Sequence, residues 1–447
     1  MKITRVEAIP FAIPYVNPLR FASGEVHTAE HVLVRVHTDD GVTGVAEAPP
    51  RPFTYGETQA SIIAVIQQLF APQVVGRTLP EREAIGARVA RTVGNPTAKA
   101  AIDMAIWDAL GRTLGLPVSD LLGGYTDRMR VSHMLGFDDP AKMVAEAERM
   151  RDTYGIRTLK VKVGRRPVSL DTAVVRALRE RFGDSVELYV DGNRGWTASE
   201  SLRAMKEMAD LDLLFAEELC PADDVLGRQW LVKRLDVPFI ADESVPTPAD
   251  VTREVLAGSA TALSIKTART GFTQSQRVHH LAEGLGLEVV MGNQIDGQLG
   301  TACTIAFGAA YQLTSRRAGE LSNFLDMSDD LLAEPLQIRD GVLLCATRGG
   351  PRRRDRPRQA RPLPHRPLNH ASPVSKSGSL WRFRAAVRKT CLRRRVHRDR
   401  GPVRTPPAAS SCTTAATKPT TAFCSEPPAW RRSSSHPLPV INSTSLP

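Results

Sequence analysis

Short apolar strands alternate with longer amphipathic segments over residues 126–345, and this alternation constrains the fold more than any other feature of the chain. Such alternation predicts parallel strands joined by crossover helices, and about eight such units form a (β/α)8-type barrel. We therefore expect an α/β fold with a barrel of this type. The predicted strands are residues 131–135, 158–163, 186–191, 213–217, 238–242, 262–266 and 287–291, with a weaker eighth at 319–321.

Charged residues stand at the last positions of five consecutive predicted strands. They are Lys162, Asp191, Glu217, Asp242 and Lys266, and 24 to 29 residues separate each from the next. Because the carboxyl ends of all barrel strands open on one face, we expect the five side chains to converge in one site. A single carboxylate at a strand end is as often a helix cap or a surface ion pair, but five in register weaken that interpretation.

The identity of these residues indicates a metal site. The carboxylates of Asp191, Glu217 and Asp242 would repel one another unless a cation lies among them, and oxygen ligands favour Mg²⁺ or Mn²⁺. Lys160 and Lys162 lie on one strand face, and with Lys266 they would flank the cation. We expect the cation to lower the pKa of these ammonium groups, which could then exchange protons with a carbon acid.

The first 125 residues predict a separate α+β domain. Residues 31–48 alternate apolar and polar side chains around Asp40-Gly41, which is a strong hairpin signal. Apolar residues recur at helical spacing after Asn95-Pro96 until Gly115, which predicts one long amphipathic helix. We therefore divide the chain into an α+β capping domain at 1–125, a barrel at 126–345 and a tail at 346–447.

Five ordered motifs resemble the enolase superfamily, and among its members the muconate-lactonizing subgroup. The resemblance runs from the first residues to about Cys345, and residues 98–124 are similar to the capping-domain helix of these proteins. Each motif alone is weak, but the ordered set is highly specific. The motifs are KVK at 160–162, VDGN at 190–193, AEEL at 216–219, ADES at 241–244 and IKTARTG at 265–271.

The resemblance implies roles for individual residues. Asp191, Glu217 and Asp242 would bind the metal, Lys162 and Lys266 would act as acid and base on opposite substrate faces, and Lys160 would assist. Asn193 and Glu243 would orient or balance the ligands. Two capping loops, 14–24 and 49–58, would set specificity. The expected substrate-binding residues are Tyr55, Arg20, Asn293, Asp296 and Glu320.

The motifs at 54–58 and 293–301 look most like those of muconate cycloisomerases, which interconvert cis,cis-muconate and muconolactone through a metal-stabilised enolate. The alternative within the superfamily is a dipeptide or N-acylamino acid epimerase. Dipeptide epimerases carry an Asp-x-Asp pair at the eighth strand, whereas this chain has Glu320 and no such pair there. We therefore favour the cycloisomerase, acting on a small carboxylate substrate as a homo-oligomer.

Several other residues are considered for a role in the site: Leu219, three glycines, two histidines and two cysteines. The family usually has Pro where this chain has Leu219, a change that could shift Glu217. Gly292, Gly297 and Gly300 lack the order of a phosphate-binding loop and are expected in turns. The remaining positions are expected to be structural: His279 and His280 as helix surface or packing residues, and Cys220 and Cys303 as core residues.

Charge separates the tail from the rest of the chain. Residues 346–447 hold 22 Lys+Arg against 3 Asp+Glu and 15 of the 32 prolines, whereas residues 1–345 carry a net charge of −8. This composition predicts disorder. Because the family would continue past Cys345, we interpret the tail as an out-of-frame product. The alternative, a nucleic-acid-binding arm beside an inert barrel, is less favoured because its aromatics show no stacking pattern.

The sequence predicts no membrane segment, because no apolar run approaches about 18 residues. The N-terminus lacks the pattern of a secretory signal, and the six cysteines show no zinc-ligand spacing. We therefore expect a cytoplasmic enzyme.

Overall fold

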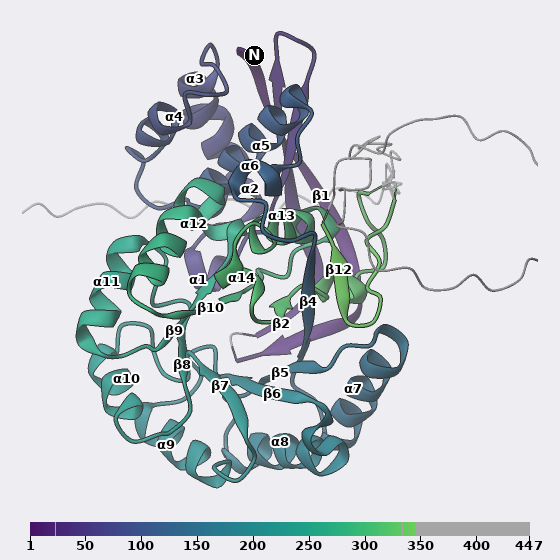
Figure 1. The fold of residues 1–447 in the computed structure, drawn as a ribbon, viewed down its shortest axis with the longest axis vertical. Helices are drawn as coiled ribbons and strands as arrows, with labels where there is room; N and C mark the ends of the chain where they lie inside the picture. Colours follow the sequence, from purple (N-terminus) through teal and green to yellow (C-terminus); the bar gives the residue numbers. More distant parts are fainter. Residues whose placement is uncertain (23, 333, 346–447) are drawn as a thin grey trace, which may run out of the picture. The chain divides into compact units, whose positions relative to one another are not determined.

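The computed structural model describes residues 1–22, 24–332 and 334–345 (Figure 1). The predictions for the tail concern residues 346–447, which lie outside this part. Within the described residues, no helix is both long enough and apolar enough to span a bilayer.

The N-terminal region is built on a three-stranded antiparallel sheet in the order β1-β2-β3. Its strands are β1 (Ile3–Phe21), β2 (Gly24–Thr38) and β3 (Thr43–Ala48). The predicted hairpin at Asp40-Gly41 is confirmed, since it joins β2 to β3 and Gly41 has a φ of 78°. The positive φ explains the glycine, because a side chain is strained in that conformation.

The expectation of a loop at 14–24 is wrong. β1 continues to Phe21 and pairs with β2 as far as Phe21 opposite Gly24, so this segment belongs to the turn end of a long hairpin. A register shift between Pro14 and Leu19 interrupts the pairing where the prolines occur. Since β1 is an edge strand, prolines that cannot donate a hydrogen bond are tolerated in it.

Six helices follow the sheet, and a five-residue π-helical turn, Ile66–Phe70, continues the second of them. The predicted long helix is confirmed as α5, which begins at Pro96 and ends before Gly115. Gly115 has a φ of 65° and closes the helix in the left-handed conformation. The helices are α1 (Pro52–Tyr55), α2 (Gln59–Val65), α3 (Ala71–Val74), α4 (Arg82–Val89), α5 (Pro96–Leu114) and α6 (Val118–Leu122).

The predicted barrel is confirmed. Eight parallel strands are hydrogen-bonded in the order β10-β9-β8-β7-β6-β5-β4-β11, and β10 contacts β11 to bring the ends of the sheet together. The strands are β4 (Arg128–Leu135), β5 (Thr158–Lys162), β6 (Glu187–Asp191), β7 (Leu213–Glu217), β8 (Phe239–Ala241), β9 (Ala262–Ile265), β10 (Glu288–Met291) and β11 (Gly319–Glu320). The sequence did not reveal β12 (Val342–Leu344), which pairs antiparallel with β4.

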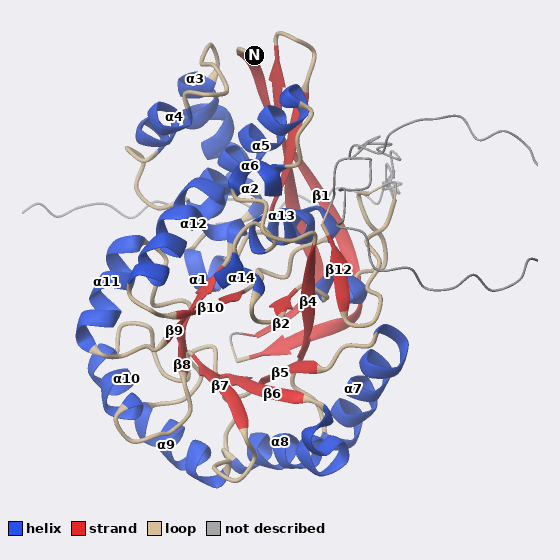
Figure 2. Cartoon of the chain, in the orientation of Figure 1, coloured by secondary structure: helices blue, strands red, loops and turns tan. Residues whose placement is uncertain are grey.

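Helices surround these strands, as Figure 2 shows for α7 to α11. They are α7 (Pro140–Tyr154), α8 (Ser169–Phe182), α9 (Ala198–Glu207), α10 (Val225–Val232), α11 (Pro248–Ala257), α12 (Thr267–Gly284), α13 (Gln298–Gly308) and α14 (Gln312–Ser315). Short 3-10 turns occur at Gly183–Ser185 and Asn323–Asp326.

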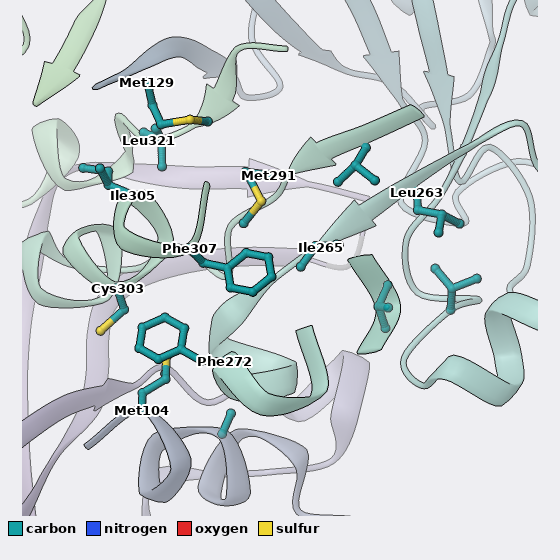
Figure 3. Close-up of a cluster of buried hydrophobic side chains, with 14 of the residues drawn as sticks. Met104, Met129, Leu263, Ile265, Phe272, Met291, Cys303, Ile305, Phe307 and Leu321 are labelled. Atoms are coloured by element: carbon teal, nitrogen blue, oxygen red, sulfur yellow. The ribbon is translucent and has the colours of Figure 1, made fainter. Parts of the chain in front are cut away.

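One hydrophobic core extends from the N-terminal helices into the barrel. In Figure 3, Met104 of α5 lies beside Phe272 of α12, near Phe307 of α13 and Met291 of β10. The rings of Phe272 and Phe307 are stacked, with centroids 6.4 Å apart. Burial of this apolar surface stabilises the contact between the N-terminal region and the barrel, which fixes the sheet and its loops relative to the strand ends.

Candidate active site

The structure brings together the charged residues predicted at the strand ends. Lys162 lies opposite Asp191 in the β5–β6 pair, and Asp191 lies opposite Glu217 in the β6–β7 pair. Asp242 and Lys266 follow β8 and β9 directly. All five side chains and that of Lys160 are buried. The barrel geometry therefore concentrates three acids and three amines at one end of the strands.

Ion pairs connect these acids and amines. Lys160 Nζ lies 2.9 Å from Asp191 Oδ2, 2.8 Å from Glu217 Oε1 and 2.5 Å from Glu320 Oε1. Lys162 Nζ lies 2.6 Å from Asp191 Oδ2, and Lys266 Nζ pairs with Asp242 Oδ2. Each of the three expected ligands therefore contacts a lysine.

The three carboxylates do not form a tight set of their own. In the described part of the chain, the one group of three metal-binding side chains whose ligand atoms all lie within 4.8 Å of one another is His279, His280 and Glu283 on α12. That group is remote in sequence from the strand-end acids, and its His279 is buried against Tyr311, with ring centroids 4.1 Å apart. Both histidines lie on α12, His279 buried and His280 exposed, which agrees with the expectation that they are helix surface or packing residues.

One atom among the carboxylates indicates that a cation fits there. Glu217 Oε2 is buried and has no hydrogen-bond partner. Burial raises the pKa of Glu217 well above its ordinary value, and the charges of Asp191, Glu320 and Asp242 add to this effect, although Lys160 opposes it. Because an unpartnered buried carboxylate oxygen is costly, a hard divalent cation held by the oxygens of Asp191, Glu217 and Asp242 would relieve both the repulsion and the lost hydrogen bond.

The pKa values of the lysines differ from our expectation. Burial acts to lower the pKa of Lys160, but Asp191, Glu217 and Glu320 raise it well above the ordinary value. For Lys266, burial likewise acts to lower the pKa, but the negative charge of Asp242 outweighs it, so the pKa is raised. The expected lowering depended on a bound divalent cation, and the chain's own carboxylates act in the opposite direction.

Asn193 and Glu243 lie where the sequence predicted, next to the charged ring. This ring consists of Lys160, Lys162, Asp191, Glu217, Asp242 and Lys266. The Asn193 backbone N–H donates to Asp191 Oδ1 at 2.8 Å, and its side-chain oxygen accepts from Lys162 Nζ at 2.6 Å. Its amide nitrogen donates to Glu243 Oε1 at 3.2 Å. Asn193 therefore links Lys162 to Glu243 and orients both.

A pocket opens above the charged ring, between the barrel and the capping segments. Seven residues predicted for the site line it: Tyr55, Lys162, Asn193, Glu243, Lys266, Asn293 and Glu320. Asp296 is buried behind the pocket, where its backbone N–H donates to Asn293 Oδ1 at 2.8 Å. Arg20 is not part of the lining, because its exposed side chain pairs with Glu25 at 3.0 Å.

The prediction missed other lining residues. Most of them are uncharged, and several lie in loops whose conformation cannot be read from the sequence. They are Arg51, Thr54, Met134, Gln294, Ile295 and Asn323. Arg51 and Thr54 fall in the segment 49–58 that was expected to cover the site, so position in that segment was the available signal.

The structure also reveals Arg269, which the sequence analysis did not single out. It is buried, and its Nη1 donates to Asp242 Oδ1 at 3.1 Å and to Tyr55 Oη at 3.1 Å. It therefore connects an expected metal ligand with a lining residue from the capping segment. Its spacing from Lys266, three residues along the start of α12, was a signal that could have identified it.

Leu219 leaves Glu217 in place. Glu217 remains paired with Asp191 in the sheet, and the chain turns at the next residue, Glu218, with a φ of 34°. Glu218 Oε2 then accepts hydrogen bonds from the backbone of Asp242 at 2.8 Å and from the Ser244 hydroxyl at 2.9 Å. The carboxylate of Glu218 thus supports the neighbouring strand end. Cys220 and Cys303 are buried free cysteines, as expected.

The fold and the site together define a barrel enzyme whose strand ends carry paired acids and amines under a capping sheet. Comparison with known families agrees with this class. Residues 5–123 match the family described as mandelate racemase / muconate lactonizing enzyme, N-terminal domain, and residues 142–351 match the enolase C-terminal domain-like family. The chain belongs to this mandelate racemase / muconate lactonizing enzyme family of the enolase superfamily.

Similar proteins in this family have different substrates. The chain is 33% identical to muconate cycloisomerase 1 of Pseudomonas putida over 346 residues, which cover 76% of this chain and 92% of that protein. It is also 33% identical to L-Ala-D/L-Glu epimerase of Bacillus subtilis (strain 168) over 320 residues, covering 71% and 87%.

Among solved structures, the chain resembles that of muconate lactonizing enzyme from Mucobacterium Smegmatis complexed with muconolactone. The identity is 80% and the TM-score 0.76, and the match covers 77% of this chain and 94% of that one.

Proposed function

We propose that this protein is a muconate cycloisomerase, which interconverts cis,cis-muconate and muconolactone. The observation that carries the proposal is that Lys162 and Lys266 line one pocket above the acids Asp191, Glu217 and Asp242. The 80% identity to a muconate lactonizing enzyme supports the choice of substrate. The lack of an Asp-x-Asp pair around Glu320 favours it over a dipeptide epimerase.

The reaction needs one new C–O bond and one proton transfer. One substrate carboxylate adds to the double bond, and the electron pair of the diene moves onto the second carboxylate as an enolate. Lys162 or Lys266 then donates a proton to the α-carbon, and the neutral amine regains a proton from solvent. In the reverse direction the same amine removes that proton.

We assign the other residues by their contacts. Asp191, Glu217 and Asp242 would hold Mg²⁺ or Mn²⁺, which when bound would supply Lewis-acid stabilisation of the charge that develops on the substrate carboxylate. Lys160, in contact with Asp191, Glu217 and Glu320, would hold these carboxylates in place. Tyr55 and Asn293 would contact the substrate from the capping segment and from the loop after β10.

The direct test follows the loss of diene absorbance when purified protein is mixed with cis,cis-muconate. We expect turnover with Mn²⁺ or Mg²⁺ and its loss with a chelator. No metal-dependent change in absorbance would refute the proposed reaction. The second candidate is an epimerase, because the chain is 33% identical to L-Ala-D/L-Glu epimerase. Exchange of α-protons for deuterium in L-Ala-L-Glu, without muconate turnover, would establish that activity instead.

The metal assignment is tested separately with Glu217→Gln. Burial opposes ionisation of the Glu217 carboxyl group, and the amide carries no charge. The metal-free variant should therefore be at least as stable as the unsubstituted protein. Because a ligand charge is lost, we expect Mn²⁺ to bind at least tenfold more weakly. Thermal unfolding with and without Mn²⁺ measures this as a smaller metal-induced rise in Tm. An unchanged rise would contradict the assignment.

We also propose a cytoplasmic location and a homo-oligomeric state. The buried free cysteines Cys220 and Cys303 are consistent with a reducing compartment. Light scattering of the purified protein measures the oligomeric state directly.

A further inference from the structure

Gly297 and Gly300 stand at the start of α13. Helix N-termini carry unpaired N–H groups and attract anions, and Gly297 has no side chain to cap its own helix. The anion here comes from another part of the chain. Glu47, on β3 of the capping sheet, accepts from the Gly297 N–H at 2.9 Å and from the Gly300 N–H at 2.8 Å.

The close approach of Glu47 explains the glycine at 297. A Cβ added there would lie 3.0 Å from Glu47 Oε1, 3.1 Å from Oε2 and 3.4 Å from Cδ, so its three nearest heavy atoms all belong to Glu47. Glu47 is buried, and a third donor holds it, since His31 Nδ1 lies 2.6 Å from Oε1. A carboxylate with three such partners is fixed in one orientation.

Glu47 binds the end of the loop 293–297, and this loop lines the pocket. Residues 293–297 connect β10 to α13, and Asn293, Gln294 and Ile295 all contribute to the lining. Ile295 has a φ of 63°, a conformation that is strained for a β-branched residue. Such a conformation persists where the surroundings enforce it, and here Gln294 Nε2 also donates to the Pro49 carbonyl at 3.1 Å, two residues after Glu47.

We infer that Glu47, oriented by His31, is a positioning residue that holds the pocket-lining loop 293–297 in its working conformation by capping α13 from the capping sheet. The inference rests on the proposed function for its kinetic consequence. Its structural basis is independent of that function, since the contacts join the sheet to the loop whatever the substrate.

The chain contains a matched control. Asp103 on α5 accepts from the backbone N–H groups of Phe272 at 2.7 Å and Thr273 at 2.9 Å, and a Cβ at Gly271 would lie 2.6 Å from Asp103 Oδ2. A buried carboxylate that accepts hydrogen bonds from backbone N–H groups beside a glycine therefore joins the capping region to α12 as well. None of these residues lines the pocket, so Asp103→Asn should lower stability without affecting the loop.

The test compares Glu47→Gln with Asp103→Asn in two measurements. Glu47→Gln should accelerate hydrogen exchange in a peptide covering residues 292–302, and Asp103→Asn should do so around residue 272 instead. With cis,cis-muconate, Glu47→Gln should lower kcat/KM by about 10- to 100-fold, because small misplacements of binding groups are costly, and Asp103→Asn should leave kcat/KM within about twofold.

A double-mutant cycle isolates the contact. Gly297→Ala should lower kcat/KM in the unsubstituted protein and have no further effect in a Glu47→Ala background, because the carboxylate it displaces is absent there. Equal effects in both backgrounds, or unchanged exchange at 292–302 in Glu47→Gln, would overturn the inference. If the unsubstituted protein does not convert muconate, the proposed function fails, and the exchange data still decide whether Glu47 holds the loop.

Discussion

Lys162 and Lys266 have unlike surroundings although they line the same pocket. Lys162 is shared between Asp191 and Asn193, whereas Lys266 is paired with Asp242. Cycloisomerisation needs one proton donor, whereas epimerisation needs an acid and a base on opposite faces. The two reactions therefore predict different consequences of removing each amine.

We expect Lys162→Met and Lys266→Met to affect muconate turnover unequally. The variant that removes the proton donor should lose about 10²- to 10⁴-fold in kcat, and the other should lose less. Stopped-flow absorbance measures both rates, and the exposed Lys206→Met on α9 is the control. Equal and complete losses in both variants would favour a two-base reaction.

Asp296 predicts a pH dependence of stability. Burial, together with the charge of Glu47, raises the pKa of Asp296 from its ordinary 3.8 to about 8. A raised pKa in the folded state means that stability is fully present below about pH 4 and is lost progressively as the pH rises to about 8. We expect Asp296→Asn to unfold at a higher temperature than the unsubstituted protein at pH 8.5, with the difference shrinking toward pH 4. A Tm difference that does not change with pH would contradict this.

At the scale of elements, the strand-end positions were predictable and the connecting segments were not. Lys162, Asp191 and Glu217 could be placed because strand period and barrel symmetry determine where a strand's last residue points. The hairpin end at 14–24 was taken for a loop because two prolines, Pro14 and Pro18, conceal an edge strand in the sequence. Arg269 and Glu47 were missed because their partners, Tyr55 and the 297–300 backbone, are distant in sequence and become neighbours only in the folded chain.

Gly44 shows how closely two elements pack in the capping region. A Cβ at this position of β3 would contact Ala105 O and would lie 2.5 Å from Ala109 N on α5. Since backbone atoms cannot move aside as a side chain can, we expect Gly44→Ala to destabilise the protein by about 1–3 kcal/mol or more. Chemical denaturation measures this, and Gly86→Ala, in open space on α4, is the control. Equal stability of the two variants would contradict this packing.

At the scale of the whole molecule, the barrel and the enolase-type relationship could be predicted because eight repeats and five ordered motifs leave few alternatives. The domain boundaries near 125 and 345 remain predictions. They have a functional consequence, since every assigned site residue lies before residue 346.

We therefore expect protein trimmed after Cys345 to retain metal-dependent muconate turnover within about twofold of the full chain. The trimmed protein should also lose any retention on DNA, because it carries a net charge of −8 where the full chain carries +11. Parallel assays of the two forms measure both properties. DNA binding that survives trimming would contradict the charge argument.

The capping segment 49–58 and the barrel strands contribute different parts of the pocket: Tyr55 lies on α1 within that segment, and Lys162 and Lys266 stand at the strand ends. Under the proposed function, Lys162 and Lys266 of the barrel would transfer the proton and residues 49–58 would contribute to substrate choice. We then expect mutations in residues 49–58 to alter which molecule is accepted while these two amines stay at the strand ends. A lineage with this architecture can acquire a new substrate without rebuilding its chemistry.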